Sequence, residues 1–252
     1  MPHSTLRVLC LNVHKGFTPL NRRFILQELR DAVRAVAADL VFLQEVIGNH
    51  AHHARRHKNW PAAPQYEYLA DTLWSDHAYG RNAVYPHGDH GNALLSRFPI
   101  LSHRNHGASS GRSEARGFLH CVIDMKGAVP GGVLHAICVH LGLFERERNH
   151  QLDELCRLIE RDVPADAPLV VAGDFNDWRA RAHERLSRCA GLRDVFVAAT
   201  GQAARTFPAR WPVLPLDRIY VRNAQASQTR VLDTRPWSHL SDHAPLVAEI
   251  HL

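Results

Sequence analysis

Residues 170–176 read Val-Val-Ala-Gly-Asp-Phe-Asn, an apolar run that ends in a carboxylate and an amide. The apolar part predicts a buried strand that delivers Asp174 to the edge of a sheet. Because alternate residues of an extended chain point the same way, Asp174 and Asn176 can converge on one spot. The carboxylate there can take a proton from water or bind a metal ion, and the amide can donate to a phosphate oxygen. Gly-Asp and Asn also favour turns, so the stretch alone fits an ordinary turn equally well.

Two more polar side chains follow apolar runs in the same manner. Glu45 comes after residues 41–44, where a strand is expected to end, and Asn12 comes after the first apolar run. A carboxylate at a sheet edge suits Mg²⁺, which prefers oxygen ligands and keeps several waters. Asn12 can complete that ligand shell or simply cap a turn, and Glu45 can equally be an exposed glutamate. Neighbouring strands would favour a shared site.

Two histidines stand at comparable places in the sequence. His140 ends the apolar run 135–139, and His243 follows Asp242 just before a terminal strand. Most single histidines are structural or exposed. His243 differs because Asp217 can orient its ring, fix its tautomer and raise its basicity.

Other basic side chains give weaker evidence for a role in the site. Arg116 follows the polar segment 107–115 and can grip a phosphate with its guanidinium, although an exposed loop arginine is the alternative. His50, His53 and His57 are expected on one solvated helical face. They lack cysteines and metal-ligand spacing, so zinc is not expected there.

The bulk composition indicates a globular protein. At 252 residues, 45% apolar and 22% charged, without repeats or linkers, the chain is expected to form one domain spanning 1–252. No apolar run is long enough to span a bilayer, and the N-terminus lacks a signal-peptide pattern. The net charge of +5 weakly favours anionic partners. Five cysteines without a CxxC pair predict buried free thiols, a reducing compartment and hence a cytoplasmic protein.

Periodicity predicts many strands and few helices. Strands are expected at residues 6–11, 39–44, 91–96, 99–106, 118–125, 133–139, 169–172, 217–221, 225–232 and 245–251. Helices are expected at 22–37, capped by Asn21, at 144–162 and at 179–189. Mixed hairpin and crossover connections indicate an α/β fold in which two mixed β-sheets pack face to face, flanked by helices.

Taken in order, these segments resemble the endonuclease/exonuclease/phosphatase superfamily of metal-dependent phosphoesterases. The resemblance covers essentially the whole chain and rests on LNVHKG, LVFLQEV, GNALLSRFPI, VHLG, VVAGDFND, LDRIYV and SDHAPL. The first motif is similar to that of a bacterial branch carrying Asn-[Ile/Val]-His-Lys-Gly. The resemblance implies a four-layered α/β sandwich with its site at one end of two packed sheets.

The resemblance also implies Mg²⁺ or Mn²⁺ as cofactor, with Glu45 as the chief ligand and Asn12 and Asp242 nearby. His14 stands where some DNA-repair members carry an acidic residue, which argues against a second metal ion. Arg218 stands where an aromatic residue is frequent and is expected to add positive charge near the site.

Catalytic roles follow from the same resemblance. Asp174 or His243 would activate water, Asn176 and His140 would stabilise the pentacoordinate phosphorus, and Asp217 would orient His243. These roles amount to in-line attack with charge neutralisation at the non-bridging oxygens.

The sequence therefore predicts a Mg²⁺-dependent phosphodiesterase, with nucleic acid, phospholipid or a small phosphorylated metabolite as open substrate classes. A nuclease should present a basic stripe, whereas a lipid phosphodiesterase should expose an apolar loop, for which residues 60–61 and 73–74 are candidates. The alternative is a non-catalytic binding module on the same scaffold. The presence of Glu45, Asp174 and His243 argues against it. The oligomeric state stays open.

Overall fold

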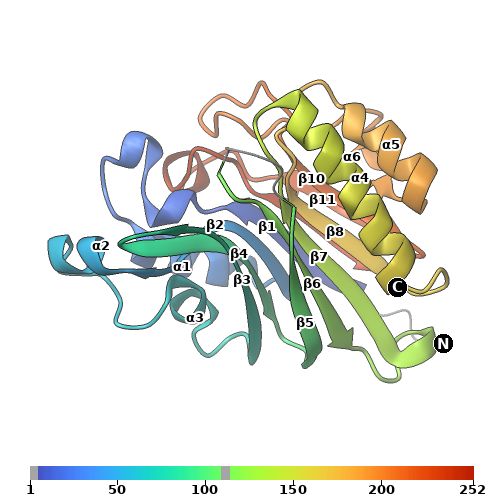
Figure 1. Cartoon of the computed structure of the whole chain (residues 1–252), viewed down its shortest axis with the longest axis horizontal. Coiled ribbons are helices and arrows are strands. Elements are labelled where there is room, and N and C mark those ends of the chain that lie inside the picture. The colour runs from blue at the N-terminus through green and yellow to red at the C-terminus, as the bar shows by residue number, and fades with distance from the viewer. Residues whose placement is uncertain (1–4, 109–113) are drawn as a thin grey trace.

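Two six-stranded sheets pack face to face in the computed structural model, which describes residues 5–108 and 114–252 (Figure 1). In spatial order the first sheet holds β11 (Gln225–Val231), β12 (Leu246–His251), β1 (Thr5–Asn12), β2 (Leu40–His50), β4 (Gly88–Ser96) and β3 (Asp76–Tyr85). The second holds β5 (Ile100–Gly107), β6 (Gly117–Asp124), β7 (Val133–His140), β8 (Leu169–Asp174), β10 (Asp217–Arg222) and β9 (Arg193–Asp194). Both sheets are mixed, because β1–β2 and β7–β8 are parallel pairs among antiparallel ones.

Helices cover the outer faces of both sheets. The α-helices are α1 (Leu26–Val36), α2 (Ala51–Arg56), α3 (Gln65–Ala70), α4 (Glu145–Asp162), α5 (Arg181–Ala190) and α6 (Val195–Thr200). Short 3₁₀ turns are η1 (His14–Gly16), η2 (Pro19–Asn21), η3 (Pro130–Gly132) and η4 (Trp237–His239). Helices α1 and α3 pack on the first sheet, and α4 and α5 pack on the second. The predicted α/β sandwich of two mixed sheets flanked by helices is confirmed.

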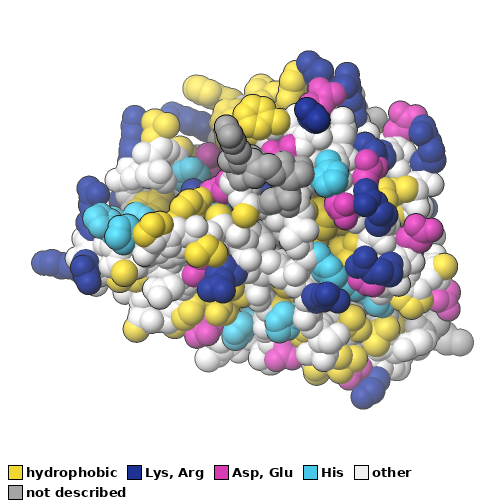
Figure 2. All heavy atoms as spheres, in the orientation of Figure 1, with side chains coloured by type: hydrophobic (Ala, Val, Ile, Leu, Met, Phe, Trp, Pro, Cys, Tyr) yellow, Lys and Arg dark blue, Asp and Glu magenta, His cyan; other side chains and the backbone are white. Residues whose placement is uncertain are grey.

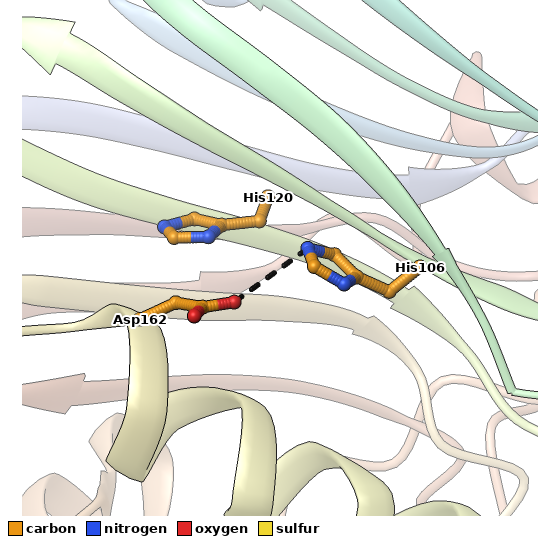
Figure 3. A group of neighbouring side chains, drawn as sticks. All are labelled: His106, His120 and Asp162. Atoms are coloured by element: carbon orange, nitrogen blue, oxygen red, sulfur yellow. Dashed lines mark ion pairs between the residues drawn. The ribbon is translucent and has the colours of Figure 1, made fainter.

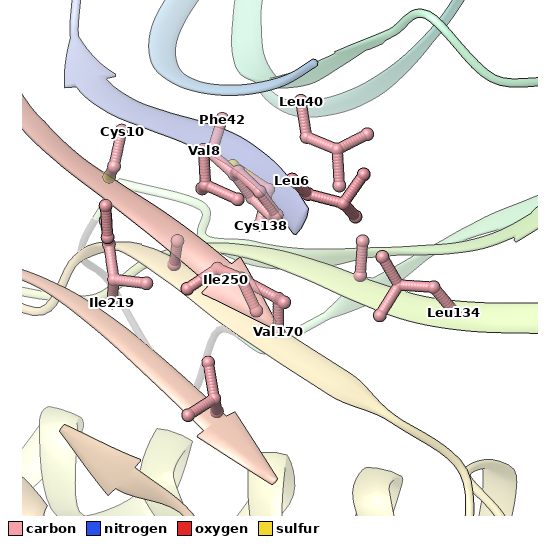
Figure 4. Packing of buried hydrophobic residues seen from close by; sticks show 14 of the residues in the cluster. Leu6, Val8, Cys10, Leu40, Phe42, Leu134, Cys138, Val170, Ile219 and Ile250 are labelled. Atoms are coloured by element: carbon pink, nitrogen blue, oxygen red, sulfur yellow. The ribbon is translucent and has the colours of Figure 1, made fainter. Parts of the chain in front are cut away.

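Alternating side chains of each central strand serve two different cores. Leu6, Val8 and Cys10 of β1 point between the sheets, where Figure 4 shows them packed against residues of the opposite sheet. Leu9 and Leu11 point the other way, towards α1. Burial on both faces explains why β1 and β8 read as near-continuous apolar runs in the sequence.

Several predicted boundaries differ from the structure. Helix α1 begins at Leu26 rather than residue 22, because Pro19 starts the turn η2 and Asn21 has φ 54°, so Asn21 is no cap. Strand β2 continues past Glu45 to His50. Strand β3 was not expected, since this edge strand carries few of the apolar residues that signal a strand.

The cysteines divide into two groups. Cys10, Cys121 and Cys138 are buried free thiols, as predicted. Cys156 of α4 and Cys189 of α5 instead form a disulfide with a Cα–Cα distance of 6.0 Å, so the expectation of free thiols is wrong for this pair. The helices pack side by side on the second sheet, a proximity that the apolar context of each cysteine does not reveal. None of the helices in the described ranges combines the length and apolar character that a membrane crossing requires.

Gly173 lets β7 and β8 approach closely enough to place Asp174. A Cβ atom at Gly173 would lie 1.9 Å from the carbonyl oxygen of Val139. We expect Gly173→Ala to destabilise the fold by about 1–3 kcal/mol through overpacking and to lower activity by displacing Asp174. Urea unfolding measures the first effect. Gly107→Ala, where a Cβ would meet nothing within 4 Å, is the matched control. Equal stability of both variants would contradict this account of β8.

Candidate active site

Three adjacent strands bring polar side chains into one row at an edge of the second sheet. In the register of the sheet, His140 lies beside Asp174 across the parallel pair β7–β8. Asp217 lies beside Asp174 across the antiparallel pair β8–β10. All three side chains are at most 3% exposed. Pairing between strands thus gathers residues that are 34 to 77 positions apart in the sequence.

The first sheet contributes Asn12 and Glu45 to the same place. Asn12 ends β1, and its Nδ2 donates to Asp174 Oδ2 at 3.2 Å and to Glu45 Oε1 at 3.4 Å. Glu45 lies within β2 rather than at its end. A register shift between Leu43 and Val46 and a φ of 57° mark a β-bulge at Glu45. This bulge turns the carboxylate towards Asn12.

Neighbouring groups keep Glu45 ionised. Burial by itself would raise the pKa of Glu45, but neighbours that include the ammonium of Lys15 and the donor Asn12 lower that pKa to about 2. Lys15 Nζ lies 3.8 Å from Glu45 Oε2. The carboxylate is therefore charged at any physiological pH and suits binding of a cation.

Asp174 has the opposite electrostatic character. Burial raises its pKa, His243 opposes this and Asp217 adds to it, so that the pKa reaches about 7. The backbone N–H of Asn176 donates to Asp174 Oδ1 at 2.9 Å, and Asn176 Nδ2 donates to the carbonyl of Leu141 at 2.9 Å. One N–H of the Asn176 amide group thus fixes its orientation and the other can serve a ligand.

Asp217 and His243 form a buried ion pair. The Nδ1–H of His243 donates to Asp217 Oδ2 at 2.8 Å, and its Nε2 lies 3.9 Å from Asp174 Oδ2. Burial alone would lower the pKa of His243, but the carboxylates of Asp217 and Asp174 raise it to about 10. Ser241 holds the segment in place, because its hydroxyl donates to the carbonyl of Asn12 and accepts from the N–H of His243.

Arg116 and His140 form a second pair with the opposite protonation. Arg116 Nη1 lies 3.0 Å from His140 Nδ1, and a guanidinium can only donate, so the proton of the neutral ring sits on Nε2. That nitrogen lies 3.4 Å from Asp174 Oδ2. Burial, and then Arg116, lower the pKa of His140 well below its usual value. Arg116 is itself 9% exposed and pairs with Glu114 at 3.1 Å, so the alternative of an exposed loop arginine is wrong.

Asp242 lies at the outer side of the cluster. Its Oδ2 is 3.2 Å from Nδ1 of His14, which accounts for an imidazole at that position. Arg218, in contrast, is buried and pairs with Asp194 at 3.5 Å. Adjacent residues of β10 point to opposite faces, so Arg218 faces away from Asp217 and adds no charge at the site. Ser241 lies within the SDHAPL segment but was assigned no role from the sequence, and Glu114 was missed because it carries no distinctive sequence signal.

The acidic side chains can accommodate a cation. Ligand atoms of Asp174, Asp217 and His243 lie within 4.8 Å of one another, and because the ring of His243 is protonated only the carboxylate oxygens can act as ligands. Asp217 Oδ1 is buried and has no hydrogen-bond partner among the described residues. Anionic oxygens without donors are the ligands of a hard divalent ion. The structure presents Asn12 with its amide nitrogen towards Glu45, so ligation through Oδ1 requires this amide to turn over.

A second group of possible metal ligands lies under the end of α4. Figure 3 shows the rings of His106 and His120 beside the carboxylate of Asp162, with His106 Nε2 at 4.0 Å from Asp162 Oδ2. Arg161 already binds both oxygens of Asp162 at 2.8 Å. His120 Nε2 is bonded to His135 at 2.9 Å. We assign no metal ion to this group.

Residues 9–243 match the Endonuclease/Exonuclease/phosphatase family, and the chain belongs to that family. Its members generally hydrolyse phosphoester bonds and depend on divalent metal ions. The chain is 54% identical over 256 residues to the uncharacterized protein YbhP of Escherichia coli (strain K12), with 100% of both chains covered. A UPF0294 protein of Erwinia tasmaniensis is 33% identical over 119 residues, covering 46% of this chain and 39% of that protein.

Solved structures share the fold at low sequence identity. The endonuclease/exonuclease/phosphatase from Beutenbergia cavernae has a TM-score of 0.76 at 20% identity, covering 98% of this chain and 72% of that one. TDP2 of D. rerio, solved with a single-strand DNA product, has a TM-score of 0.69 at 18% identity, covering 99% and 100%. These similarities establish the sandwich fold.

Removing the charge of Asp217 should remove a main cause of the raised pKa of His243. Because the pKa of His243 is raised, protonation of its ring stabilises the folded state. This stabilisation is complete below the ordinary pKa of 6.5 and is lost as the pH rises through about 10. We expect Asp217→Asn to lower the pKa of His243 towards or below 6.5. The variant should also lose less stability than the wild type between pH 7 and 10. NMR titration of the ring and thermal unfolding, both in EDTA, measure these effects. An unchanged pKa would contradict the pairing.

Proposed function

We propose that this protein is a divalent-metal-dependent phosphodiesterase that hydrolyses its substrate by in-line attack of an activated water. The environment of Asp174 is the observation that carries the proposal. Burial raises the pKa of this carboxylate towards neutrality, and the carboxylate contacts Asn12, His140 and His243. A general base works best when its pKa is near the working pH.

We assign the metal ion to Glu45, Asn12 and Asp242, with Mg²⁺ as cofactor or Mn²⁺ in its place. Ionised Glu45 supplies the strongest ligand, and the amide of Asn12 lies beside it. Asp242, which pairs with His14, comes from the segment before β12. The metal ion, when bound, neutralises phosphate charge and the charge that develops on the leaving oxygen.

The protein's own groups then divide the remaining work. Asp174 takes a proton from the attacking water. His243 is protonated at neutral pH and can neutralise a non-bridging oxygen, while Asp217 holds its ring in place. The free N–H of the Asn176 amide and the Nε2–H of His140 can donate to the pentacoordinate phosphorus group.

Arg116 acts first as a positioning residue in this proposal. Its guanidinium fixes the tautomer of His140. The positive charge of that guanidinium is the predicted contact for a substrate phosphate.

The phosphoester can belong to a nucleic acid, a phospholipid or a small metabolite. A non-catalytic binding module is disfavoured, because it would have no need for a buried carboxylate with a pKa near neutrality beside a neutral histidine. We place the protein in the cytoplasm on the strength of its three buried free thiols, although the Cys156–Cys189 disulfide argues against a reducing compartment.

Asp174→Asn should lower hydrolysis of bis(4-nitrophenyl) phosphate with Mg²⁺ or Mn²⁺ by at least about 10³-fold, since the amide cannot accept a proton. Plasmid nicking under the same conditions tests duplex DNA as the substrate. EDTA should abolish both activities. Asp166→Asn, an exposed aspartate in the segment between α4 and β8, is the matched control and should match the wild type. Full activity of Asp174→Asn would contradict the assignment of Asp174 as the general base.

Glu45→Gln should weaken metal binding more than it alters the fold. We expect the apparent Kd for Mn²⁺, measured by isothermal titration calorimetry, to rise at least about tenfold, because a neutral amide replaces the ionised ligand. Glu160→Gln, an exposed residue of α4, keeps the same chemistry away from the site and serves as control. Equal Mn²⁺ affinity in wild type and Glu45→Gln would remove Glu45 from the metal site.

A further inference from the structure

Large apolar side chains are exposed on the segments that leave the catalytic edge. They are between 49% and 77% exposed and are here called the apolar rim: Leu20, Leu143, Phe144, Trp178, Trp211 and Val213. Trp178 follows Asp174 by four positions, and Val213 precedes Asp217 by four. Figure 2 shows hydrophobic side chains gathered beside Lys and Arg at the upper edge of the molecule, where Figure 1 places these loops. Exposed apolar groups concentrated at one edge indicate an interaction surface.

Contacts join the rim segments in two groups, one of which borders the proposed site. Arg179, next to Trp178, pairs with Glu145, next to Phe144, at 3.0 Å. Pro19 and Arg210, the neighbours of Leu20 and Trp211, line one cavity of about 510 Å³. Asp242 lines the same cavity. The cavity between the segments that carry Leu20 and Trp211 therefore reaches Asp242, one of the proposed metal ligands.

Arginines are interleaved with the apolar side chains. The guanidinium of Arg179 lies 4.5 Å from the ring centre of Trp178, and that of Arg210 lies 5.3 Å from Trp211. Arg22, Arg23 and Arg210 line the cavity beside Asp242. Arg23 and Arg179 pair with Glu28 and Glu145, whereas within the described part of the chain Arg22 and Arg210 have no ion pair. Tryptophan and arginine together are typical of surfaces at the boundary between water and anionic lipid.

We propose that the apolar rim docks on an anionic phospholipid bilayer and that the substrate is a phospholipid phosphodiester whose headgroup enters the arginine-lined cavity. The docking surface is inferred only from the exposed apolar side chains and the neighbouring arginines. The substrate class rests on the proposed phosphodiesterase activity. Apolar side chains would enter the acyl boundary while the guanidiniums bind headgroup phosphates.

The make-up of the rim favours lipid over nucleic acid. Leu20, Leu143 and Val213 are aliphatic and offer no π-face on which a base can stack. The loops expected from the sequence do not take part, since Trp74 is 2% exposed and Trp60 stacks on Phe24. They stabilise the first sheet's outer face instead.

Vesicle flotation tests the docking surface without requiring turnover. We expect the metal-loaded wild type to float with vesicles of phosphatidylcholine containing about one-third phosphatidylglycerol and to bind pure phosphatidylcholine more weakly. The double variant Trp178→Ala/Trp211→Ala should partition to the mixed vesicles at least about tenfold less. Leu101→Ala is the matched control, because Leu101 is 53% exposed on β5 and lies outside the rim. Unchanged melting temperatures establish that all variants are folded.

Three results would overturn the proposal: absence of flotation, equal loss with Leu101→Ala, or rim-dependent binding of a single-stranded oligonucleotide in place of vesicles. Hydrolysis of bis(4-nitrophenyl) phosphate, which needs no membrane, separates the two proposals. Hydrolysis without flotation leaves the phosphodiesterase standing and removes the lipid surface. Flotation without hydrolysis removes the catalytic assignment and with it the lipid substrate. Release of a phosphorylated headgroup from the mixed vesicles confirms both.

Discussion

The hydrogen bond from Asn12 to Asp174 is the contact on which the rest of the site depends. It joins the end of a strand in the first sheet to the end of a strand in the second, and the same amide reaches Glu45. Both sheets must pack at one distance and register for this bond to form. The buried apolar layer between them sets that distance, so the core and the site are parts of one constraint.

Electrostatic neighbours give chemically similar groups different roles at this edge. Glu45 stays ionised, whereas Asp174 is held close to its titration point near neutral pH. His140 is neutral beside a guanidinium, and His243 is protonated beside two carboxylates. In the proposed mechanism, proton acceptance, charge neutralisation and hydrogen-bond donation thus fall to these four side chains.

The rim places the chemistry at a boundary between water and an apolar phase. The same loops carry the exposed tryptophans and, a few residues away, the buried groups of the site. A substrate held by its apolar part would reach the cavity with its phosphate foremost. Exposed apolar side chains gathered at one edge are typical of an interaction surface.

The sequence alone determined the sandwich and the row of polar residues at strand ends, because strands buried on both faces are near-continuous apolar runs and Asp174, His140 and Asp217 adjoin such runs. Tertiary structure decided what those runs do not encode. The bulge at Glu45 arises from a register shift against β4, and the burial of Arg116 arises from its contact with His140. The Cys156–Cys189 disulfide depends on two helices meeting. Register, burial and long-range proximity are properties of pairs of elements, so no single stretch of sequence contains them.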